Sequence, residues 1–433
     1  MSDTTLGLSI LGIMFVLLAL RAPVWLALAL CGIGGNFLIS GPYAAKLLAG
    51  ATPFDQATNY NLSVVPLFIL MGEVATSSRL SSELFQAARV VFSGLRGGLA
   101  IATIGASGAF GTVCGSSVAT AATMTRISLP EMRRAGFTDS FSTASIAAGG
   151  TLGILIPPSI ILVIYSAIAE LSLRKLFAAA FLPGVALAIL YVLIALGVAA
   201  LSRGQVPADP PASLSTRLKA LAAPWQFLIL FTVTIGGIYM GIFSPNEAAA
   251  IGAFGAILLG FVTRRLSFLA LRQALRATAI TSAMLFLIII AATMFANFVV
   301  QTKLPDFLIA EAQAMGFGRI AVLSSIIVIY LVLGCFLEGI GMVLITVPVF
   351  LPVVTSFGYD PIWFGVIVVI VVEIGLISPP VGMNIFVIQA QFADLKLVDI
   401  YRGILPFLLA PLILILALFV APQIALWLPQ ALY

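Results

Sequence analysis

The chain contains the stretch Gly153-Ile154-Leu155-Ile156-Pro157-Pro158, and a shift of 222 residues places it on Gly375-Leu376-Ile377-Ser378-Pro379-Pro380. At the same offset, Leu129-Pro130 falls on Leu351-Pro352, and Gly136-Phe137 falls on Gly358-Tyr359. Several landmarks at one offset indicate an internal repeat. The sequence therefore predicts two equivalent halves, each with a Pro-Pro element at the same place.

The composition is that of a membrane protein. Of the 433 residues, 61% are hydrophobic and 9% are charged, and the mean hydropathy is +1.19. Soluble domains carry about 25% charged residues. The net charge of +5 does not indicate a nucleic-acid partner, because the Lys and Arg residues stand between apolar segments. The expected surroundings are a lipid bilayer.

Residues for most catalytic chemistry are missing. The sequence has no histidine, which excludes Ser-His-Asp and Cys-His catalysis and His-ligated metal sites. It has no GxxxxGK[ST] motif for ATP. All five lysines lie in connections, so an intramembrane Ser-Lys enzyme is disfavoured, and the three scattered cysteines are interpreted as small buried residues. We expect no enzyme, no catalytic residue and no cofactor.

Ten segments are approximately long and apolar enough to span a bilayer, for which about 20 residues are needed. A polar, Pro-rich linker at 202–222 divides the chain into a first half, 1–201, and a second half, 223–433, with five segments each. The segments are 5–20, 23–40, 61–78, 139–170, 175–201, 223–243, 246–264, 278–300, 361–395 and 403–430.

Two further apolar stretches, 97–131 and 319–354, are interrupted by glycine-rich tips at 111–117 and 334–341. Their arms are mostly too short to cross a bilayer. We expect re-entrant hairpins whose tips lie at membrane depth, shielded by protein. The segments 139–170 and 361–395, which contain the Pro-Pro elements, are predicted to be broken helices.

Each half has an odd number of spans, so the second half is predicted to enter the membrane upside down relative to the first. Inverted repeats with interrupted helices are the architecture of secondary transporters. With this topology, 16 of the 21 Lys and Arg residues fall on one side, which the positive-inside rule makes cytoplasmic. The sequence thus predicts a bacterial inner-membrane protein with both termini in the periplasm.

The Pro-Pro elements force a helix to stop and restart inside the bilayer, because proline lacks a backbone donor and clashes with the preceding turn. Carbonyls freed at the end of the first half-helix can bind a cation. The start of the second half-helix presents a partial positive charge to an anion. A simple proline kink is the alternative, which the repetition beside two glycine-rich hairpins disfavours.

Several further motifs are spread along the whole chain. They are Gly115-Ser116-Ser117-Val118-Ala119-Thr120-Ala121-Ala122-Thr123, Leu129-Pro130-Glu131-Met132, Gly136-Phe137, Gly153-Ile154-Leu155-Ile156-Pro157-Pro158-Ser159, Ser244-Pro245-Asn246-Glu247-Ala248-Ala249-Ala250 and Ser378-Pro379-Pro380-Val381-Gly382-Met383-Asn384. Together they resemble the motifs of the large membrane subunit of TRAP transporters, the tripartite ATP-independent periplasmic transporters. Two departures are Cys114, where a small residue without sulfur is expected, and Glu338, where Asp is more usual.

The resemblance implies an elevator-type transporter that imports organic acids, typically carboxylates, with a sodium gradient. It also implies two partners: a small four-helix membrane subunit, expected here as a separate polypeptide, and a periplasmic substrate-binding protein. A stand-alone ion-coupled carboxylate symporter or antiporter of similar fold remains the alternative. Genes for a secreted binding protein and a four-helix protein beside this one would distinguish the two.

From these patterns we expect two sodium sites, one per half, each between a hairpin tip and the nearby Pro-Pro break, because sodium favours oxygen ligands. Small hydroxyl residues at such tips also mediate ordinary helix packing. The cation candidates are Thr112, Gly115, Ser116, Gly153 and Pro157 in the first half, and Gly334, Gly339, Gly341, Gly375, Ser378 and Pro379 in the second. The substrate candidates are Ser117, Thr120, Pro158, Ser159, Pro380, Val381 and Asn384.

Four carboxylates stand within or near apolar segments. Ionisable residues inside such segments are functional candidates, which favours roles for Glu338 and Glu373, with structural pairing as the alternative. For Glu73 and Glu247, which lie nearer segment ends, a structural role is favoured. The stretches 79–85 and 303–308, which precede the two hairpins, look like short amphipathic connectors or plain loops.

Overall fold

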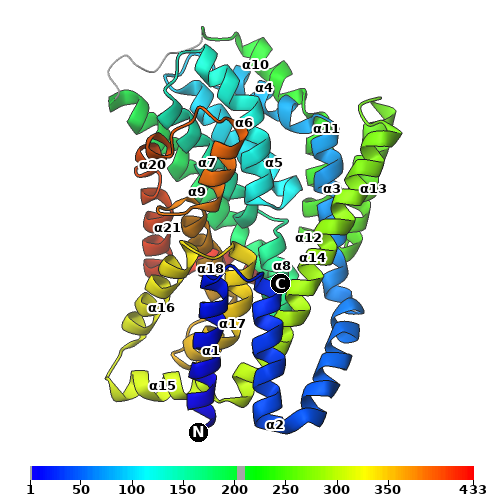
Figure 1. Cartoon of the computed structure of the whole chain (residues 1–433). Helices are drawn as coiled ribbons and strands as arrows, with labels where there is room; N and C mark the ends of the chain where they lie inside the picture. Colours follow the sequence, from blue (N-terminus) through cyan, green and yellow to red (C-terminus); the bar gives the residue numbers. More distant parts are fainter. Residues whose placement is uncertain (1, 202–209) are drawn as a thin grey trace.

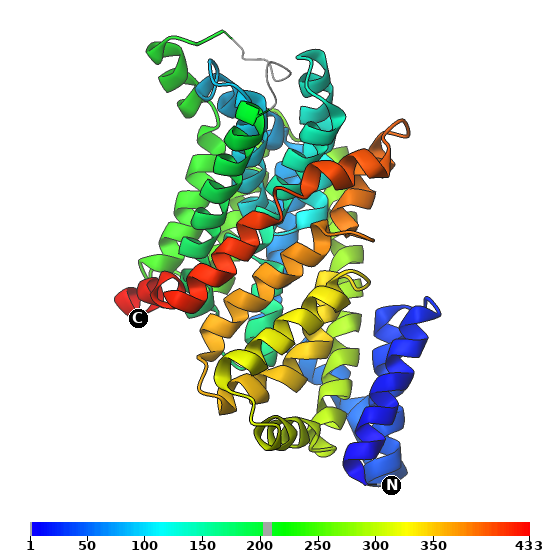
Figure 2. The ribbon, with the colours of Figure 1, turned by 90° about the vertical axis from the view of Figure 1, so that its left-hand side faces the viewer.

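The computed structural model describes residues 2–201 and 210–433, which form helices and turns, with no strand in these two ranges (Figure 1). The expected all-helical class is confirmed. Part of the expected linker, 202–209, lies outside the described residues, and the rest includes α10 (Leu214–Ala222). Figure 2 shows α1 (Asp3–Ala19), in blue, and α22 (Gln423–Leu432), in red, at opposite edges of the molecule.

The spanning helices differ in detail from the ten expected segments. Within the described ranges, seven helices are long and apolar enough to cross a membrane, or up to nine if each of two bent pairs is one span. The span expected at 23–40 is the first part of α2 (Val24–Ala57), which bends at Gly41, φ 80°. The span expected at 278–300 is part of α14 (Phe268–Gln301). At 1.5 Å per residue this helix is about 51 Å long, more than the bilayer core requires.

Helix ends recur at the offset of 222 residues. The helix α7 (Asp139–Leu155) has the bounds of α18 (Pro361–Ile377) at this offset, and α6 (Ser117–Arg134) has those of α17 (Gly339–Ser356). Glycine follows both α6 and α17 in a left-handed conformation, with φ 84° at Gly136 and φ 78° at Gly358. The peptide bonds Pro157–Pro158 and Pro379–Pro380 are both cis. The sequence repeat is therefore also a repeat of backbone structure.

Both expected hairpins are pairs of helices joined by a short turn. The first consists of α5 (Gly98–Cys114) and α6, and the second of α16 (Arg319–Gly334) and α17. Figure 1 places the first pair in the upper half of the molecule and the second pair in the lower half. One arm differs from expectation: α17 is itself long and apolar enough to cross a membrane.

Both Pro-Pro helices are interrupted where the sequence indicates. In the first, α7 ends at Leu155 and α8 (Ile160–Ile168) continues at an angle of 40°. In the second, α18 ends at Ile377 and α19 (Met383–Gln391) follows. The segment 156–159 between α7 and α8 is called the first break below, and the segment 378–382 between α18 and α19 is called the second break.

The expected connectors are helices, which resolves the choice between helix and loop. The helices α4 (Leu80–Val91) and α15 (Leu304–Ala314) each follow a residue in the left-handed region, Arg79 at φ 60° and Lys303 at φ 53°. A positive φ is uncommon for such residues, and here it turns the chain sharply away from the preceding helix. Figure 1 shows α4 and α15 at opposite ends of the molecule.

Four of the remaining helices form a wall. The long helices α2 and α14 run side by side, and α3 (Val64–Ser77) packs along α13 (Pro245–Val262). The hairpins contact this wall through α3, which packs against α5, and through α14, which packs against α17. The other elements are η1 (Tyr60–Ser63), α9 (Leu173–Leu201), α11 (Trp225–Phe231), the π-helix η2 (Thr232–Gly236), α12 (Gly237–Tyr239), α20 (Leu397–Ile404) and α21 (Leu409–Val420).

Glycine pairs hold each hairpin against its Pro-Pro helix. A Cβ added at Gly153 would lie 2.7 Å from the Cα of Gly111, and a Cβ added at Gly375 would lie 2.7 Å from the Cα of Gly334. A distance of 2.7 Å is shorter than the non-bonded contacts that Cβ atoms make in proteins. The nearby atom belongs to the backbone, so the two helices would have to move apart. The two glycine pairs therefore let α5 reach α7 and α16 reach α18 at equivalent places.

We predict that Gly153→Ala and Gly375→Ala each lower the thermal unfolding temperature of the purified protein. The added methyl group must push two backbones apart, and overpacking of this kind costs about 1–3 kcal/mol. The matched control is Gly197→Ala in α9, where nothing lies within 4 Å of the added Cβ. The unfolding temperature of this control variant should stay the same or rise. Equal unfolding temperatures for all three variants would contradict the close approach.

Candidate functional site

A cavity of about 500 Å³ lies where the two halves of the chain meet. Part of its lining comes from α3 and α14, and the rest comes from both hairpin tips and both broken helices. The lining residues are Ile69, Gly72, Glu73, Cys114, Gly115, Ser116, Ser117, Val118, Ala119, Ala122, Ile154, Ile160, Ile161, Thr281, Met284, Leu285, Ile288, Glu338, Gly339, Ile340, Leu376 and Met383.

Four helices begin at this cavity. Their first residues all line it: Ser117 of α6, Ile160 of α8, Gly339 of α17 and Met383 of α19. Unpaired N–H groups give each helix start a partial positive charge of roughly half an elementary charge. Helix starts of this kind bind anions. Four of them around one cavity favour a negatively charged group close to a helix start, whereas Glu73 and Glu338 in the same lining oppose one; no Lys or Arg of the described chain lines the cavity.

Hydroxyl groups cap the two helix starts of the first half. The Ser116 Oγ accepts a hydrogen bond from the Ala119 N–H at 3.3 Å, and the Ser159 Oγ accepts one from the Leu162 N–H at 3.3 Å. In the second half, neither Glu338 before α17 nor Gly382 before α19 provides a side-chain cap. The starts of α17 and α19 therefore keep more of their N–H groups available than the starts of α6 and α8.

One hydrogen bond joins the two halves beside the cavity. The Asn384 Nδ2 donates to the Ser117 Oγ at 2.5 Å. Asn384 is fully buried, and its Oδ1 has no partner among the described residues; the same is true of the buried Thr120 Oγ1. Buried polar atoms are rarely left unpaired. These two oxygens are therefore candidates to bind something that the protein itself does not supply.

Each hairpin tip lies against the break of its own half. At the first tip, a Cβ added to Gly115 would lie 3.3 Å from the Pro158 carbonyl oxygen. At the second tip, the Cys335 Sγ donates to the Pro379 carbonyl at 3.5 Å and lies 3.9 Å from the Ser378 Oγ. In each half, a carbonyl oxygen of the break therefore lies beside the hairpin tip.

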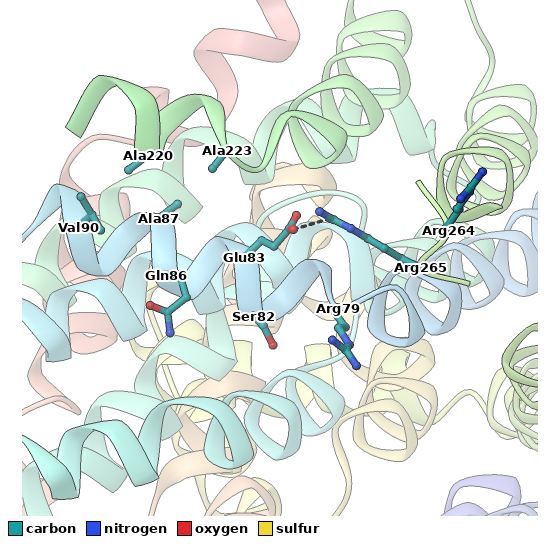
Figure 3. A pocket seen from close by; sticks show the side chains of 10 residues that line it. All are labelled: Arg79, Ser82, Glu83, Gln86, Ala87, Val90, Ala220, Ala223, Arg264 and Arg265. Atoms are coloured by element: carbon teal, nitrogen blue, oxygen red, sulfur yellow. Dashed lines mark ion pairs between the residues drawn. The ribbon is translucent and has the colours of Figure 1, made fainter. Parts of the chain in front are cut away.

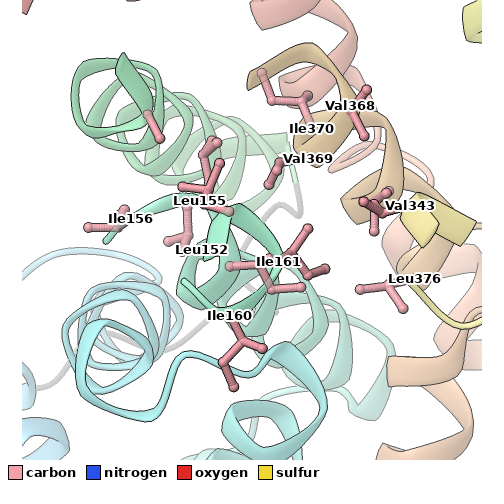
Figure 4. Close-up of a cluster of buried hydrophobic side chains, with 14 of the residues drawn as sticks. Leu152, Leu155, Ile156, Ile160, Ile161, Val343, Val368, Val369, Ile370 and Leu376 are labelled. Carbon is pink, nitrogen blue, oxygen red and sulfur yellow. The ribbon is translucent and has the colours of Figure 1, made fainter. Parts of the chain in front are cut away.

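The first break also packs against the second half. Figure 4 shows Ile161 on the side of the first break that faces Val343 of α17, and Leu155 near Val369 of α18, whereas Ile156 points to the opposite side; all of them are buried. The helices α7 and α8 pack against α18 and α17. The two halves therefore share a buried apolar core beside the first break.

Of the candidate residues from the sequence, Gly115, Ser116, Ser117 and Gly339 line the cavity. Two other candidates have contacts outside the cavity. The Thr112 hydroxyl donates to the Ala109 carbonyl at 2.7 Å, and Gly341 faces Val24 of α2. The remaining candidates lie behind the lining, at the breaks or within the hairpin arms. They are Thr120, Gly153, Pro157, Pro158, Ser159, Gly334, Gly375, Ser378, Pro379, Pro380, Val381 and Asn384.

The carboxylates occupy three different settings. Glu338 and Glu73 line the cavity, so a purely structural role is no longer favoured for Glu73. Glu247 closes a capping box at the start of α13, where its Oε2 accepts from the Ser244 N–H at 2.7 Å. Glu373 is fully buried in α18, and neither of its oxygens has a hydrogen-bond partner in the described chain.

Sequence reasoning missed the wall formed by α3 and α14. Gly72 and Glu73 come from α3, and Thr281 and Met284 come from α14. A carboxylate and a hydroxyl within otherwise apolar segments were the only signals for them. Those signals do not show which side of a helix meets the hairpins.

Comparison with known proteins agrees with this arrangement. Residues 11–424 match the family model of the DctM component of tripartite ATP-independent periplasmic transporters. The chain is 34% identical to the C4-dicarboxylate TRAP transporter large permease protein DctM of Pseudomonas aeruginosa, over 92% of this chain and 93% of that protein. It is 32% identical to the sialic acid large permease SiaM of Vibrio cholerae, over 94% of this chain and 97% of that protein.

Solved structures support the fold. The YdaH transporter of Alcanivorax borkumensis superposes with a TM-score of 0.62 over 90% of both chains at 15% identity. MtrF of Neisseria gonorrhoeae superposes with a TM-score of 0.58 at 16% identity, over 89% of this chain and 85% of that one. The fold is thus that of a multi-span membrane transporter, and the family match is specific: the chain belongs to the DctM family, the large permease components of the tripartite ATP-independent periplasmic transporters.

Proposed function

We propose that the chain is the large permease subunit of a sodium-coupled, binding-protein-dependent importer of organic acids. Family membership makes it a transporter permease. The main observation in favour of an organic acid as the cargo is that four helices begin at one cavity. Partial positive charges from helix starts hold a carboxylate without a full basic charge inside the bilayer.

The cargo carboxylate is expected against the start of α19. This start has no side-chain cap, and its first residue, Met383, lines the cavity. The start of α17 is equally uncapped, but Glu338 precedes it and repels an anion. The hydroxyls of Ser116 and Ser117 lie on the same cavity and supply donors to the remaining polar groups of the cargo.

Bound sodium is proposed to offset the negative charges of the site. Glu73, Glu338 and an anionic cargo together place several negative charges in a site of low dielectric, where unpaired charges are costly. The carbonyl oxygens of the breaks that lie beside the tips, Pro158 in the first half and Pro379 in the second, are hard ligands of the kind that sodium favours. Two sodium sites of this kind, one per half, place cations beside the cargo.

The two halves are proposed to be inverted repeats in an elevator-type transporter. The placement of equivalent hairpins in opposite halves of the molecule, and of α4 and α15 at opposite ends, supports the inversion (Figure 1). In this proposal the hairpins and broken helices carry the cargo past the wall of α2, α3, α13 and α14. Both termini then face the periplasm of a bacterial inner membrane.

Two partners complete the proposal: a small four-helix membrane subunit and a periplasmic substrate-binding protein. The names of the relatives support a multi-component system. One longer relative, the isethionate TRAP transporter permease protein DctMQ of Oleidesulfovibrio alaskensis, is 31% identical, and the match covers 98% of this chain and 69% of that protein. A stand-alone carboxylate symporter or antiporter is the second candidate function, and the partner experiment separates the two.

We predict that the purified chain in proteoliposomes moves little organic acid by itself. Uptake should appear when both the small subunit and the liganded binding protein are added, because each supplies a step that this chain lacks. Liposomes with only one of the two partners are the control. Saturable uptake by the chain alone would favour the stand-alone symporter.

We predict that Ser116→Ala and Ser378→Ala raise the sodium concentration that gives half-maximal uptake. Losing one good ligand costs about 1–2 kcal/mol, or roughly a five- to thirty-fold rise. Ser116 also caps α6, so Ser116→Thr, which keeps a hydroxyl, should restore most of the sodium affinity. Ser325→Ala, on the exposed side of α16, is the matched control.

Unchanged sodium dependence in both alanine variants would refute coordination by these side chains. Uptake that a proton gradient drives equally well without sodium would refute sodium as the coupling ion, whatever the variants show.

A further inference from the structure

A tyrosine from another helix bonds to the backbone of the second break. No backbone N–H within residues 2–201 and 210–433 donates to the carbonyl oxygens of Pro380 or Val381. The hydroxyl of Tyr401, in α20, donates to the Pro380 carbonyl at 2.5 Å and reaches the Val381 carbonyl at 3.3 Å. Both carbonyls stand directly before Gly382, at φ 62°, after which α19 begins. The tyrosine therefore holds the chain where α19 starts.

The helix that carries Tyr401 rests on the first half of the chain. The helix α20 packs along α7, and a Cβ added at Gly403 would lie 2.1 Å from the Ser140 carbonyl oxygen. A side chain at this position would collide with the backbone of α7, so glycine permits the close approach. Through α20, the Tyr401 hydroxyl therefore ties the second break to the first broken helix.

The other end of α19 is tied to the first half as well. Arg133, near the end of α6, pairs with Asp394 at 2.8 Å and with Asp139 at the start of α7 at 2.7 Å. Its guanidinium also lies over the ring of Phe392, 5.6 Å from the ring centroid. With 9 residues, α19 is about 14 Å long. Arg133 thus holds the far end of this short helix, and Tyr401 holds the end that faces the cavity.

We propose that Tyr401 is a positioning residue: its hydroxyl fixes the start of α19 and, with it, the Pro379 carbonyl beside the second tip. Its effect on cargo and sodium rests on the proposed function, in which this start meets the cargo carboxylate and this carbonyl binds sodium. Tyr401 does not line the cavity, so it acts through the backbone of the break. The residue 222 positions earlier is Ala179 in α9, which offers the first break no hydroxyl.

The test compares Tyr401→Phe, which removes only the hydroxyl, with two controls. Tyr239→Phe also removes a hydroxyl that donates to a backbone carbonyl, that of Phe177 at 3.1 Å, but it lies in α12, outside the cavity lining and the breaks. Glu83→Gln breaks the ion pair between Glu83 of α4 and Arg265 (Figure 3). Because Figure 1 shows α4 and α20 in the same half of the molecule, this control loosens a neighbouring region without touching the second break.

Hydrogen–deuterium exchange of the full purified chain in detergent reports on the start of α19 without any transport. The N–H groups of Ile385 and Phe386 donate to the Gly382 carbonyl at 2.8 and 3.2 Å. In Tyr401→Phe these two amides should exchange about fivefold faster, because one hydrogen bond that fixes the break is lost. Neither control should change them. Equal exchange in all variants, or equal acceleration throughout α18 and α19, would overturn the proposal.

Uptake with both partners gives the second readout. Tyr401→Phe should need about fivefold more sodium for half-maximal uptake, with an unchanged maximum at saturating sodium, and both controls should resemble the native chain. A lower maximum with unchanged sodium dependence would contradict a positioning role, because general loss of folded protein has that effect. Native uptake without sodium dependence would refute the coupling ion of the proposed function, and the exchange measurement would then decide the role of Tyr401 by itself.

Discussion

The structure depends on four helix starts that lie inside a membrane protein and not at its surface. A helix end leaves backbone groups without intrahelical partners, and in an apolar environment each costs several kcal/mol if unpaired. The breaks after Leu155 and Ile377 and the tips after Cys114 and Gly334 create these ends. Packing each tip against a break, with both facing one cavity, lets the same groups serve as binding atoms.

The two halves use this constraint differently. Serine side chains cap α6 and α8 in the first half, so part of the N–H capacity there is already used. The starts of α17 and α19 have no such cap. Equivalent backbones with different caps give an asymmetric cavity, which suits an asymmetric cargo. The bond between Asn384 and Ser117 joins the first hairpin tip to the broken helix of the second half.

The sequence predicted the features that are local to a segment. The Pro-Pro pairs located both breaks, the glycines located both tips, and the offset of 222 residues relates helix ends at both places. The cavity wall could not be found in this way, because the placement of Glu73 and Thr281 in the same cavity as the tips depends on how α3 and α14 pack. The pairing of Asn384 with Ser117 likewise joins residues 267 positions apart, and no pattern within either segment indicates it.

Cysteine labelling can show whether the two hairpins enter the membrane from opposite sides. Arg96→Cys and Gly318→Cys lie just before the two hairpins, at equivalent positions of the repeat, and both sites are exposed. In a background where Cys31, Cys114 and Cys335 are replaced by alanine, intact spheroplasts are treated with a membrane-impermeant maleimide. If the hairpins are inverted, Gly318→Cys is labelled in intact spheroplasts, and Arg96→Cys is labelled only after permeabilisation. Labelling of both sites from the same side would contradict the inversion.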